Sequence, residues 1–70
     1  MIDVSEIAAL AELYDRYANA LERMAPDRLT ARRQFHARLE MLYEREHAGL
    51  PYDTFRFELV RRCKEYLTKN

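Results

Sequence analysis

Apolar residues recur along this chain at the three- and four-residue spacing that places side chains on one face of an α-helix. From Ile7 to Met24 the steps between successive apolar positions are 3, 4, 3, 4 and 3 residues, an unbroken helical seam. Two later stretches show the same spacing. They are separated by residues 25–27, which contain the first proline, and by residues 48–53, which contain the only glycine and the second proline. The pattern predicts three helices, over residues 4–24, 28–47 and 54–68.

The apolar stripe of each predicted helix identifies the expected core. Alanines flank the stripe of the first helix, so its apolar arc is wider than one helix contact needs. Cys63 continues the stripe of the third helix, and we expect it to be a small buried apolar residue rather than a nucleophile. The expected inward residues of the second and third helices are Ala31, Phe35, Leu39, Leu42, Phe55, Leu59 and Cys63, with Tyr66 or Leu67.

Residues suited to helix ends lie at the predicted boundaries. Ser5 is expected to cap the first helix, Asp27 or Thr30 the second and Asp53 the third, because such side chains accept hydrogen bonds from free backbone N–H groups. Gly49 is expected to end the second helix in the left-handed conformation.

The length of 70 residues allows one domain, residues 1–70, and the pattern assigns it to the all-α class as a three-helix bundle. A domain this small often needs a second copy for stability, and the wide apolar arc of the first helix offers a surface for one. We therefore expect a homodimer formed through the first helix. Its expected interface consists of Ile7, Leu10, Leu13, Tyr14, Tyr17 and Leu21.

Charge is balanced overall and uneven along the chain. Twelve Lys and Arg match twelve Asp and Glu, which excludes strong attraction of the whole molecule to nucleic acid or membrane. Residues 1–25 hold two basic and five acidic groups (−3), residues 26–50 five and four (+1), and residues 51–70 five and three (+2). The last helix is therefore mildly basic and the first acidic.

Composition also excludes several function classes. A single cysteine excludes an intramolecular disulfide framework and a cysteine-rich zinc site, and a single glycine excludes a glycine-rich phosphate loop. Ser5, the only serine, has no histidine beside it. We expect a protein that is not an enzyme and needs no cofactor. No apolar stretch approaches the roughly 20 residues of a membrane span, and the acidic start is unlike a signal peptide, so we expect a cytoplasmic protein without a membrane partner.

The segment 49–62 has the layout of a helix-turn-helix. A long helix ends at Gly49, Leu50 anchors a short turn, and a second helix opens with polar and aromatic residues. This segment resembles the recognition-helix region of small helix-turn-helix proteins from bacterial plasmids and other mobile elements. The matching residues are Gly49, Leu50, Tyr52, Thr54, Phe55, Arg56, Arg61 and Arg62.

The resemblance implies a small regulatory protein that places its third helix on double-stranded DNA. Phe57 would touch a thymine methyl group, while Arg56 or Arg61 would reach guanine edges or phosphates. Arg32, Arg33 and Arg38 on the second helix would extend the basic surface. The expected DNA-binding residues are Tyr52, Thr54, Arg56, Phe57, Arg61, Arg62 and Lys64.

An alternative interpretation is a non-enzymatic helical module that binds another protein, such as an adaptor, an inhibitor or an antitoxin-like partner. Five tyrosines and ten arginines suit such an interface. On this interpretation Phe57 packs under the first helix or in a dimer interface, and the arginines of the third helix pair with Glu58 and Glu65.

A third interpretation is a dimeric metal-binding bundle. His36, Glu40, Glu44 and His47 lie near one face of the second helix, and Glu44 with His47 makes a Glu-x-x-His step of the kind used by di-iron bundles. The same stripe lies outside the apolar seam, which also fits a solvated charged face.

Overall fold

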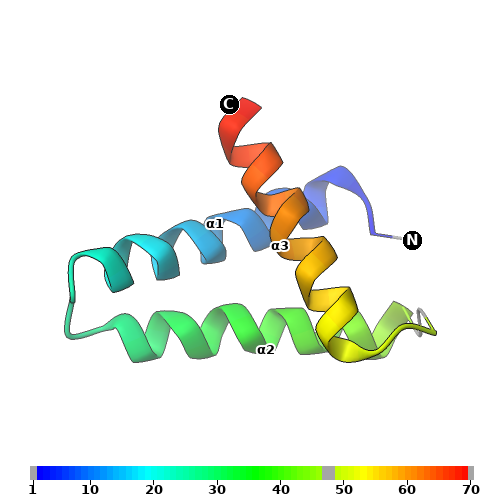
Figure 1. Cartoon of the computed structure of the whole chain (residues 1–70), viewed down its shortest axis with the longest axis horizontal. Coiled ribbons are helices and arrows are strands. Elements are labelled where there is room, and N and C mark those ends of the chain that lie inside the picture. Colours follow the sequence, from blue (N-terminus) through cyan, green and yellow to red (C-terminus); the bar gives the residue numbers. More distant parts are fainter. Residues whose placement is uncertain (1, 47–48, 70) are drawn as a thin grey trace.

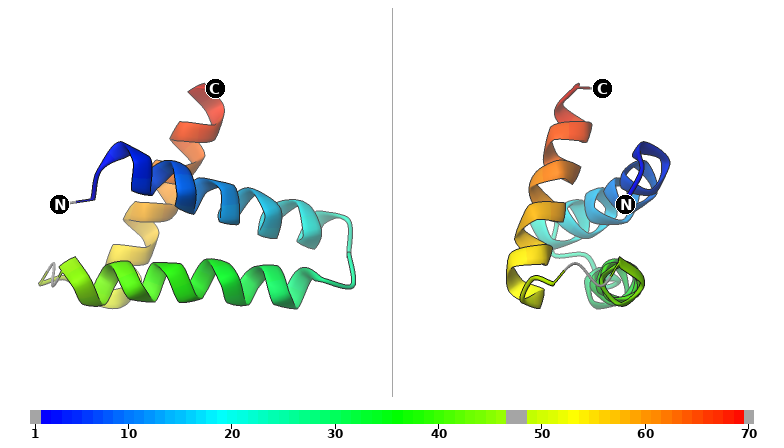
Figure 2. Two further views of the ribbon diagram at one scale, coloured as in Figure 1. Left: turned by 180° about the vertical axis from the view of Figure 1, so that it is seen from behind. Right: turned by 90° about the vertical axis from the view of Figure 1, so that its right-hand side faces the viewer.

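The computed structural model describes residues 2–46 and 49–69. It confirms an all-α three-helix bundle, with α1 spanning Val4–Glu22, α2 Arg28–Glu46 and α3 Tyr52–Lys69. Figure 1 shows α1 and α2 as an antiparallel hairpin, and Figure 2 shows α3 crossing one side of that hairpin. Helix α1 packs along both other helices, whereas α2 and α3 contact each other over only a small area. The third helix therefore rests mainly on α1, not on its predecessor.

Helix α1 begins at Val4 as predicted, but its capping residue and its end differ from the prediction. Asp3, not Ser5, is the N-cap: its carboxylate accepts from the Glu6 N–H at 2.9 Å and from the Ser5 hydroxyl at 2.8 Å. At the other end the helix stops at Glu22 instead of residue 24. Met24 adopts the left-handed conformation with φ 54°, and the Ala25 N–H donates to the Ala20 carbonyl at 2.8 Å. This geometry is a Schellman turn, which normally uses glycine at the left-handed position.

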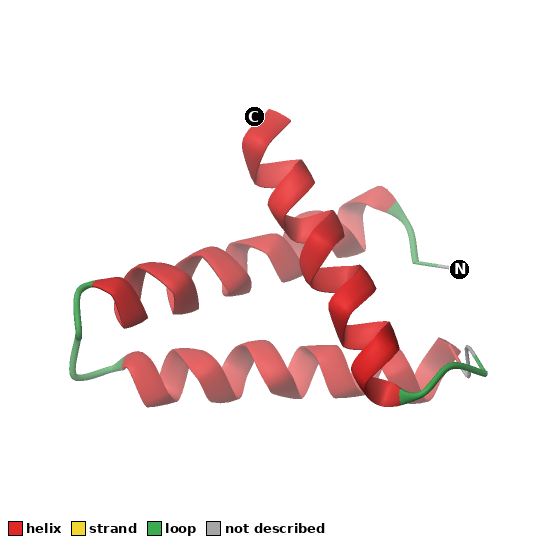
Figure 3. Ribbon diagram, in the orientation of Figure 1, coloured by secondary structure: helices red, strands yellow, loops and turns green. Residues whose placement is uncertain are grey.

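The second connection places α3 earlier than predicted. Gly49 has φ 69°, which confirms the expected left-handed turn. The Phe55 N–H donates to the Pro51 carbonyl at 3.1 Å, so the first helical turn closes on Pro51 and α3 begins at Tyr52. Asp53 consequently lies inside the first turn and does not cap it. Residue 47, the predicted end of the second helix, lies outside the described residues. Figure 3 shows how the two connections join the helices.

The predicted inward stripes of α2 and α3 are confirmed. All seven residues named from the pattern are buried, and Leu39 and Cys63 have no exposed surface. Tyr66 and Leu67 pack against this core from its edge. Burial raises the pKa of the Cys63 thiol to about 11, which keeps it protonated and unreactive at neutral pH.

The expected dimer seam on α1 lies largely inside the chain. Ile7 and Leu10 belong to the core with 4% and 0% of their surface exposed, and Leu13 packs at its edge. The rings of Tyr14 and Tyr17 lie 5.5 and 6.2 Å from that of Phe35 on α2. Of the six residues, Leu21 is the most exposed, with half of its surface accessible. The placement of Ile7 and Leu10 in a dimer interface is thus corrected, while dimerisation itself stays a prediction.

None of the helices, over the described ranges, has the length and apolar character needed to cross a membrane.

Candidate nucleic-acid interface

The predicted DNA-binding residues fall on three different sides of α3. Thr54, Arg56, Phe57, Arg61 and Lys64 are exposed, whereas Tyr52 and Arg62 are half-buried. The helical repeat divides them, because residues four apart share a stripe and residues one or two apart do not. Each side has its own charge environment.

Arg61 lies on a stripe that its own helix neutralises. Its guanidinium pairs with the Glu58 carboxylate at 2.7 Å and with the Glu65 carboxylate at 2.5 Å, and these bonds raise its pKa, Glu58 contributing most. Arg61 remains half exposed. Two carboxylates beside one guanidinium leave this stripe acidic on balance, so it repels phosphate. The pairing of Arg61 with Glu58 and Glu65, which the alternative interpretation predicts, is confirmed. The contact of Arg61 with DNA stays a prediction.

Arg62 lies on the side of α3 that faces the start of α1. Together with Glu65, Tyr66 and Lys69 it lines a shallow hollow shared with Val4 and Ile7. A partner seated on α3 from the α2 side would not reach this flank. Arg62 therefore does not belong to the same surface as Arg56.

The stripe of positions 56, 60 and 64 keeps its positive charge. Arg56 makes one long ion pair, 3.5 Å, with the highly exposed Asp53, and Lys64 makes no ion pair with any described residue. Phe57 adjoins this stripe with 70% of its surface exposed. The alternative interpretation placed Phe57 either under the first helix or in a dimer interface. The first placement is wrong, because Phe57 is exposed, and the second stays a prediction. Arg56, Lys64 and Phe57 thus remain available as one surface.

Helix α2 adds a run of positive charge that contains no carboxylate. Between Asp27 and Glu40 the chain contains four arginines and one histidine but no carboxylate. Two of the arginines, Arg32 and Arg33, line a hollow that also includes Tyr52 at the start of α3. Arg38 projects on a different side, since it is six positions from Arg32 and five from Arg33, and it lines no part of the same hollow.

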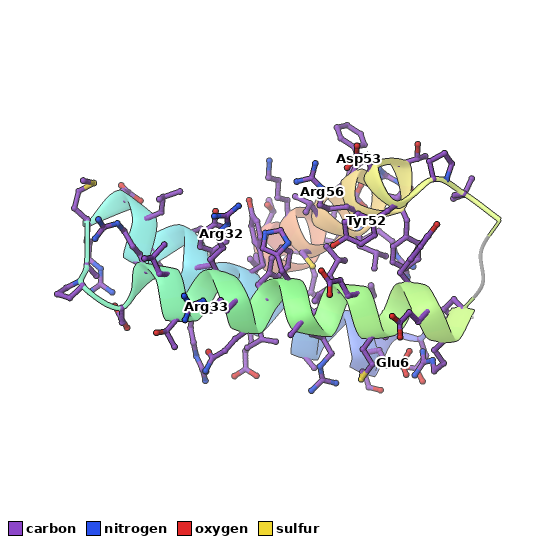
Figure 4. All side chains as sticks on the ribbon, turned by 90° about the horizontal axis from the view of Figure 1, so that it is seen from below. Glu6, Arg32, Arg33, Tyr52, Asp53 and Arg56 are labelled. Carbon is purple, nitrogen blue, oxygen red and sulfur yellow. The ribbon has the colours of Figure 1, made fainter. Side chains whose placement is uncertain are left out.

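A hollow of about 430 Å³ lies where α2 meets the start of α3, and we call it the basic groove. Figure 4 shows Tyr52 between the ribbons of the two helices, with Arg56 beside it on α3 and Arg32 on the neighbouring part of α2. Glu40 is the one carboxylate among the groove residues. The groove is lined by Leu29, Arg32, Arg33, His36, Glu40 and Tyr52.

His36 and Tyr52 form the partly buried floor of the basic groove. Burial lowers the pKa of His36, and the charges of Arg32 and Arg56 lower it further, while Glu40 opposes them. Burial, followed by the charge of Glu40, raises the pKa of Tyr52, so its hydroxyl stays a proton donor. Within residues 2–46 and 49–69 that hydroxyl oxygen is buried and has no hydrogen-bond partner. An unpaired buried polar group costs roughly 1–3 kcal/mol.

The metal hypothesis finds no assembled site in the described part of the chain. No group of three or more His, Cys, Asp or Glu residues there could hold an ion. Glu40 and Glu44 are exposed on α2, His36 lies on the floor of the basic groove, and His47 lies outside the described residues. The four-residue set stays a prediction.

The sequence analysis named most of the groove residues, but it did not predict that they line one groove. Arg32 and Arg33 were expected as an extension of the α3 surface, Tyr52 and Arg56 as part of it, and His36 as a metal ligand. The acid-free arginine run on α2 was the available signal. The sequence pattern does not give the angle at which α3 leaves the turn. That angle determines that Tyr52 lies against α2.

Comparisons with protein-family models, curated proteins and solved structures found no match for this chain.

Proposed function

We propose that this protein is a small DNA-binding module of the helix-turn-helix kind that contacts duplex DNA with the basic groove and the adjoining stripe of α3. The single observation that carries the proposal is the run of α2 between Asp27 and Glu40, which has four arginines and no carboxylate and from which Arg32 and Arg33 line the basic groove. Arg32, Arg33, Arg56 and Lys64 then supply the phosphate contacts. Phe57 is exposed next to them and can reach a base edge, such as a thymine methyl.

The charges on α3 favour this surface over the stripe that carries Glu58, Arg61 and Glu65. Phosphate is repelled where Glu58 and Glu65 flank Arg61, and attracted where arginines outnumber carboxylates. The zero net charge of the chain means that attraction must come from a local cluster. We therefore expect α3 to lie off the centre of the DNA major groove, so that the duplex also contacts α2.

The test is the binding of a fluorescently labelled duplex of about 20 base pairs, followed by anisotropy at about 50 and about 200 mM salt. We expect affinity to fall steeply with salt. The double variant Arg32→Ala/Arg33→Ala should lower affinity and reduce the salt slope by about 2, since each phosphate contact contributes about 0.9.

A matched control removes the same charge elsewhere. Arg16→Ala/Arg38→Ala deletes two exposed arginines that do not line the basic groove, so it should change affinity far less. Arg61→Ala should also have little effect, because Arg61 is already paired. Equal losses from both double variants, or no binding at low salt, would contradict the proposal.

The protein-binding alternative rests on Phe57. A phenylalanine with 70% of its surface exposed is the kind of anchor that protein interfaces use. If the duplex experiment fails, capture by a binding protein that survives high salt and is lost in Phe57→Ala would favour this second candidate.

A further inference from the structure

The end of the α1–α2 hairpin that carries the connecting turn is rich in exposed apolar side chains. Among the described residues, three of the seven exposed large apolar side chains come from the short stretch 21–29. They are Leu21, Met24 and Leu29, with 50%, 69% and 57% of their surface accessible. Leu29 also lines the basic groove. Apolar side chains that gather beside charged ones are typical of a surface that another molecule covers.

The pairing of α1 with α2 places Leu21 next to the basic groove. The ring of Tyr17 on α1 lies 6.4 Å from that of His36, which lines the groove. Because the two helices are antiparallel, one helical turn further toward their connection brings Leu21 on α1 opposite Arg32 on α2. Leu21 and Leu29 are therefore both neighbours of Arg32. We call the surface formed by Leu21, Leu29, Arg32 and Arg33 the leucine–arginine face.

We propose that the leucine–arginine face docks an amphipathic helix of another protein, whose apolar stripe covers the two leucines and whose acidic residues pair with the two arginines. A helix suits this surface because side chains of a third helix can pack into the furrow between two antiparallel helices. The other common mode of docking, the addition of a strand, needs the edge of a sheet. Residues 2–46 and 49–69 form no strand.

The charges around the leucine–arginine face determine the kind of partner. Two arginines and one carboxylate, Glu40, line the basic groove, so the groove is positive on balance. Arg56 on α3 adds to this charge, because it acts electrostatically on His36 in the same groove. A two-fold contact with a second copy would bring identical arginines together, and like charges repel. The charges therefore favour a helix with Glu or Asp beside its apolar stripe over a second copy of this chain.

The inference rests on the proposed function in one respect, because the acidic helix and the duplex would use the same two residues, Arg32 and Arg33. These guanidinium groups cannot pair with both ligands at once, so the helix would displace DNA and regulate its binding. The leucines distinguish the two ligands. The phosphate backbone has no apolar surface to cover them, whereas the apolar stripe of a helix does.

The test uses a designed, fluorescently labelled peptide of about 20 residues, long enough to form a helix, with leucines along one face and glutamates beside them. Binding is followed by anisotropy as protein is added at constant salt. One control peptide has glutamine in place of every leucine, and the other has lysine in place of every glutamate. We expect saturable binding of the first peptide and at least about ten-fold weaker binding of each control, since burial of one leucine alone is worth about that factor. Equal binding of all three peptides would overturn the inference.

A double variant tests the apolar contacts separately from the charges. Leu21→Ser/Leu29→Ser leaves every charge in place, so it should weaken binding of the acidic peptide at least about ten-fold and leave duplex affinity unchanged. Its melting temperature should stay close to that of the unmodified protein, because both leucines are exposed. Val4→Ser/Met41→Ser is the matched control. It removes two exposed apolar residues that do not line the basic groove, so it should change neither affinity.

Failure of this inference and failure of the proposed function give different results. If the acidic peptide binds as expected and the duplex does not, the inference holds and the proposed function is wrong. If the duplex binds and the peptide does not, the inference is wrong and the function stands.

Three further outcomes would count against the inference. Unchanged peptide affinity in Leu21→Ser/Leu29→Ser would overturn it. Binding of peptide and duplex at the same time would overturn the shared use of Arg32 and Arg33. Self-association of the unmodified protein that is lost in the double leucine variant would assign the face to a second copy and overturn the inference too.

Discussion

His36 lies where all three helices come close together. Its ring contacts that of Tyr17 on α1 at 6.4 Å and that of Phe35 at 5.4 Å. Arg32 on the same helix and Arg56 on α3 add repulsion to the protonated form. Folding therefore favours the neutral imidazole, and the pKa of His36 lies below its ordinary value of 6.5.

The lowered pKa of His36 makes stability depend on pH in a defined direction. Below pH 6.5 the unfolded chain binds a proton at this residue that the folded chain resists, so the His36 contribution is complete above pH 6.5 and is lost as pH falls toward the folded value. Thermal unfolding at pH 7.5 and 5.0 should show a larger loss for the unmodified protein than for His36→Gln. The carboxyls of Asp3 and Glu6 have pKa values below 3.8 and 4.5 and titrate in a more acidic range. Equal losses in both proteins would show that His36 is not the group responsible.

At the scale of the elements, the end of α1 is built on an unusual residue. Met24 occupies the left-handed position of the Schellman turn with φ 54°, a conformation that carries a steric penalty for any residue with a Cβ atom. Its side chain is 69% exposed, so it contributes little packing that would compensate.

Met24→Gly should therefore stabilise the protein by roughly 0.5–1 kcal/mol, since glycine adopts this conformation without strain. Urea unfolding followed by circular dichroism measures the change. Met24→Ala is the control: it removes the same side chain but keeps the Cβ atom, and it should give no comparable gain. If both variants behave alike, the turn is not strained at Met24.

The helices and their inward faces could be predicted because those features are local. The spacing of Phe55, Leu59 and Cys63 defines the buried side of α3 whatever it packs against. Cap positions were less accurate, because several polar residues near each start compete, and at α1 Asp3 was used instead of Ser5. The basic groove could not be predicted, because it depends on how α3 crosses the hairpin, and that crossing is decided by contacts between distant residues of α1 and α3.

At the scale of the whole molecule, one small core has to support the fold. A chain of about this length hides only roughly 60% of its unfolded surface, so stability depends on few residues. Helix α1 is central to it, because it is the element that packs along both others. Leu10 lies fully buried within this core, whereas Leu21, on the same predicted seam, is half exposed.

Substitutions of Leu10 and Leu21 distinguish a role of α1 in the core from a role of α1 in a dimer interface. Leu10→Ala should cost about 2–5 kcal/mol, a large part of the roughly 5–15 kcal/mol available to a folded domain. Leu21→Ala should change stability by less than about 0.5 kcal/mol. Urea unfolding of both variants at two protein concentrations, about 100-fold apart, measures both effects. A dimer formed through α1 would instead make the midpoint rise with concentration, and Leu21→Ala would remove that rise, because association stabilises only the folded state. That outcome would show α1 to be an interface as well as the centre of the core.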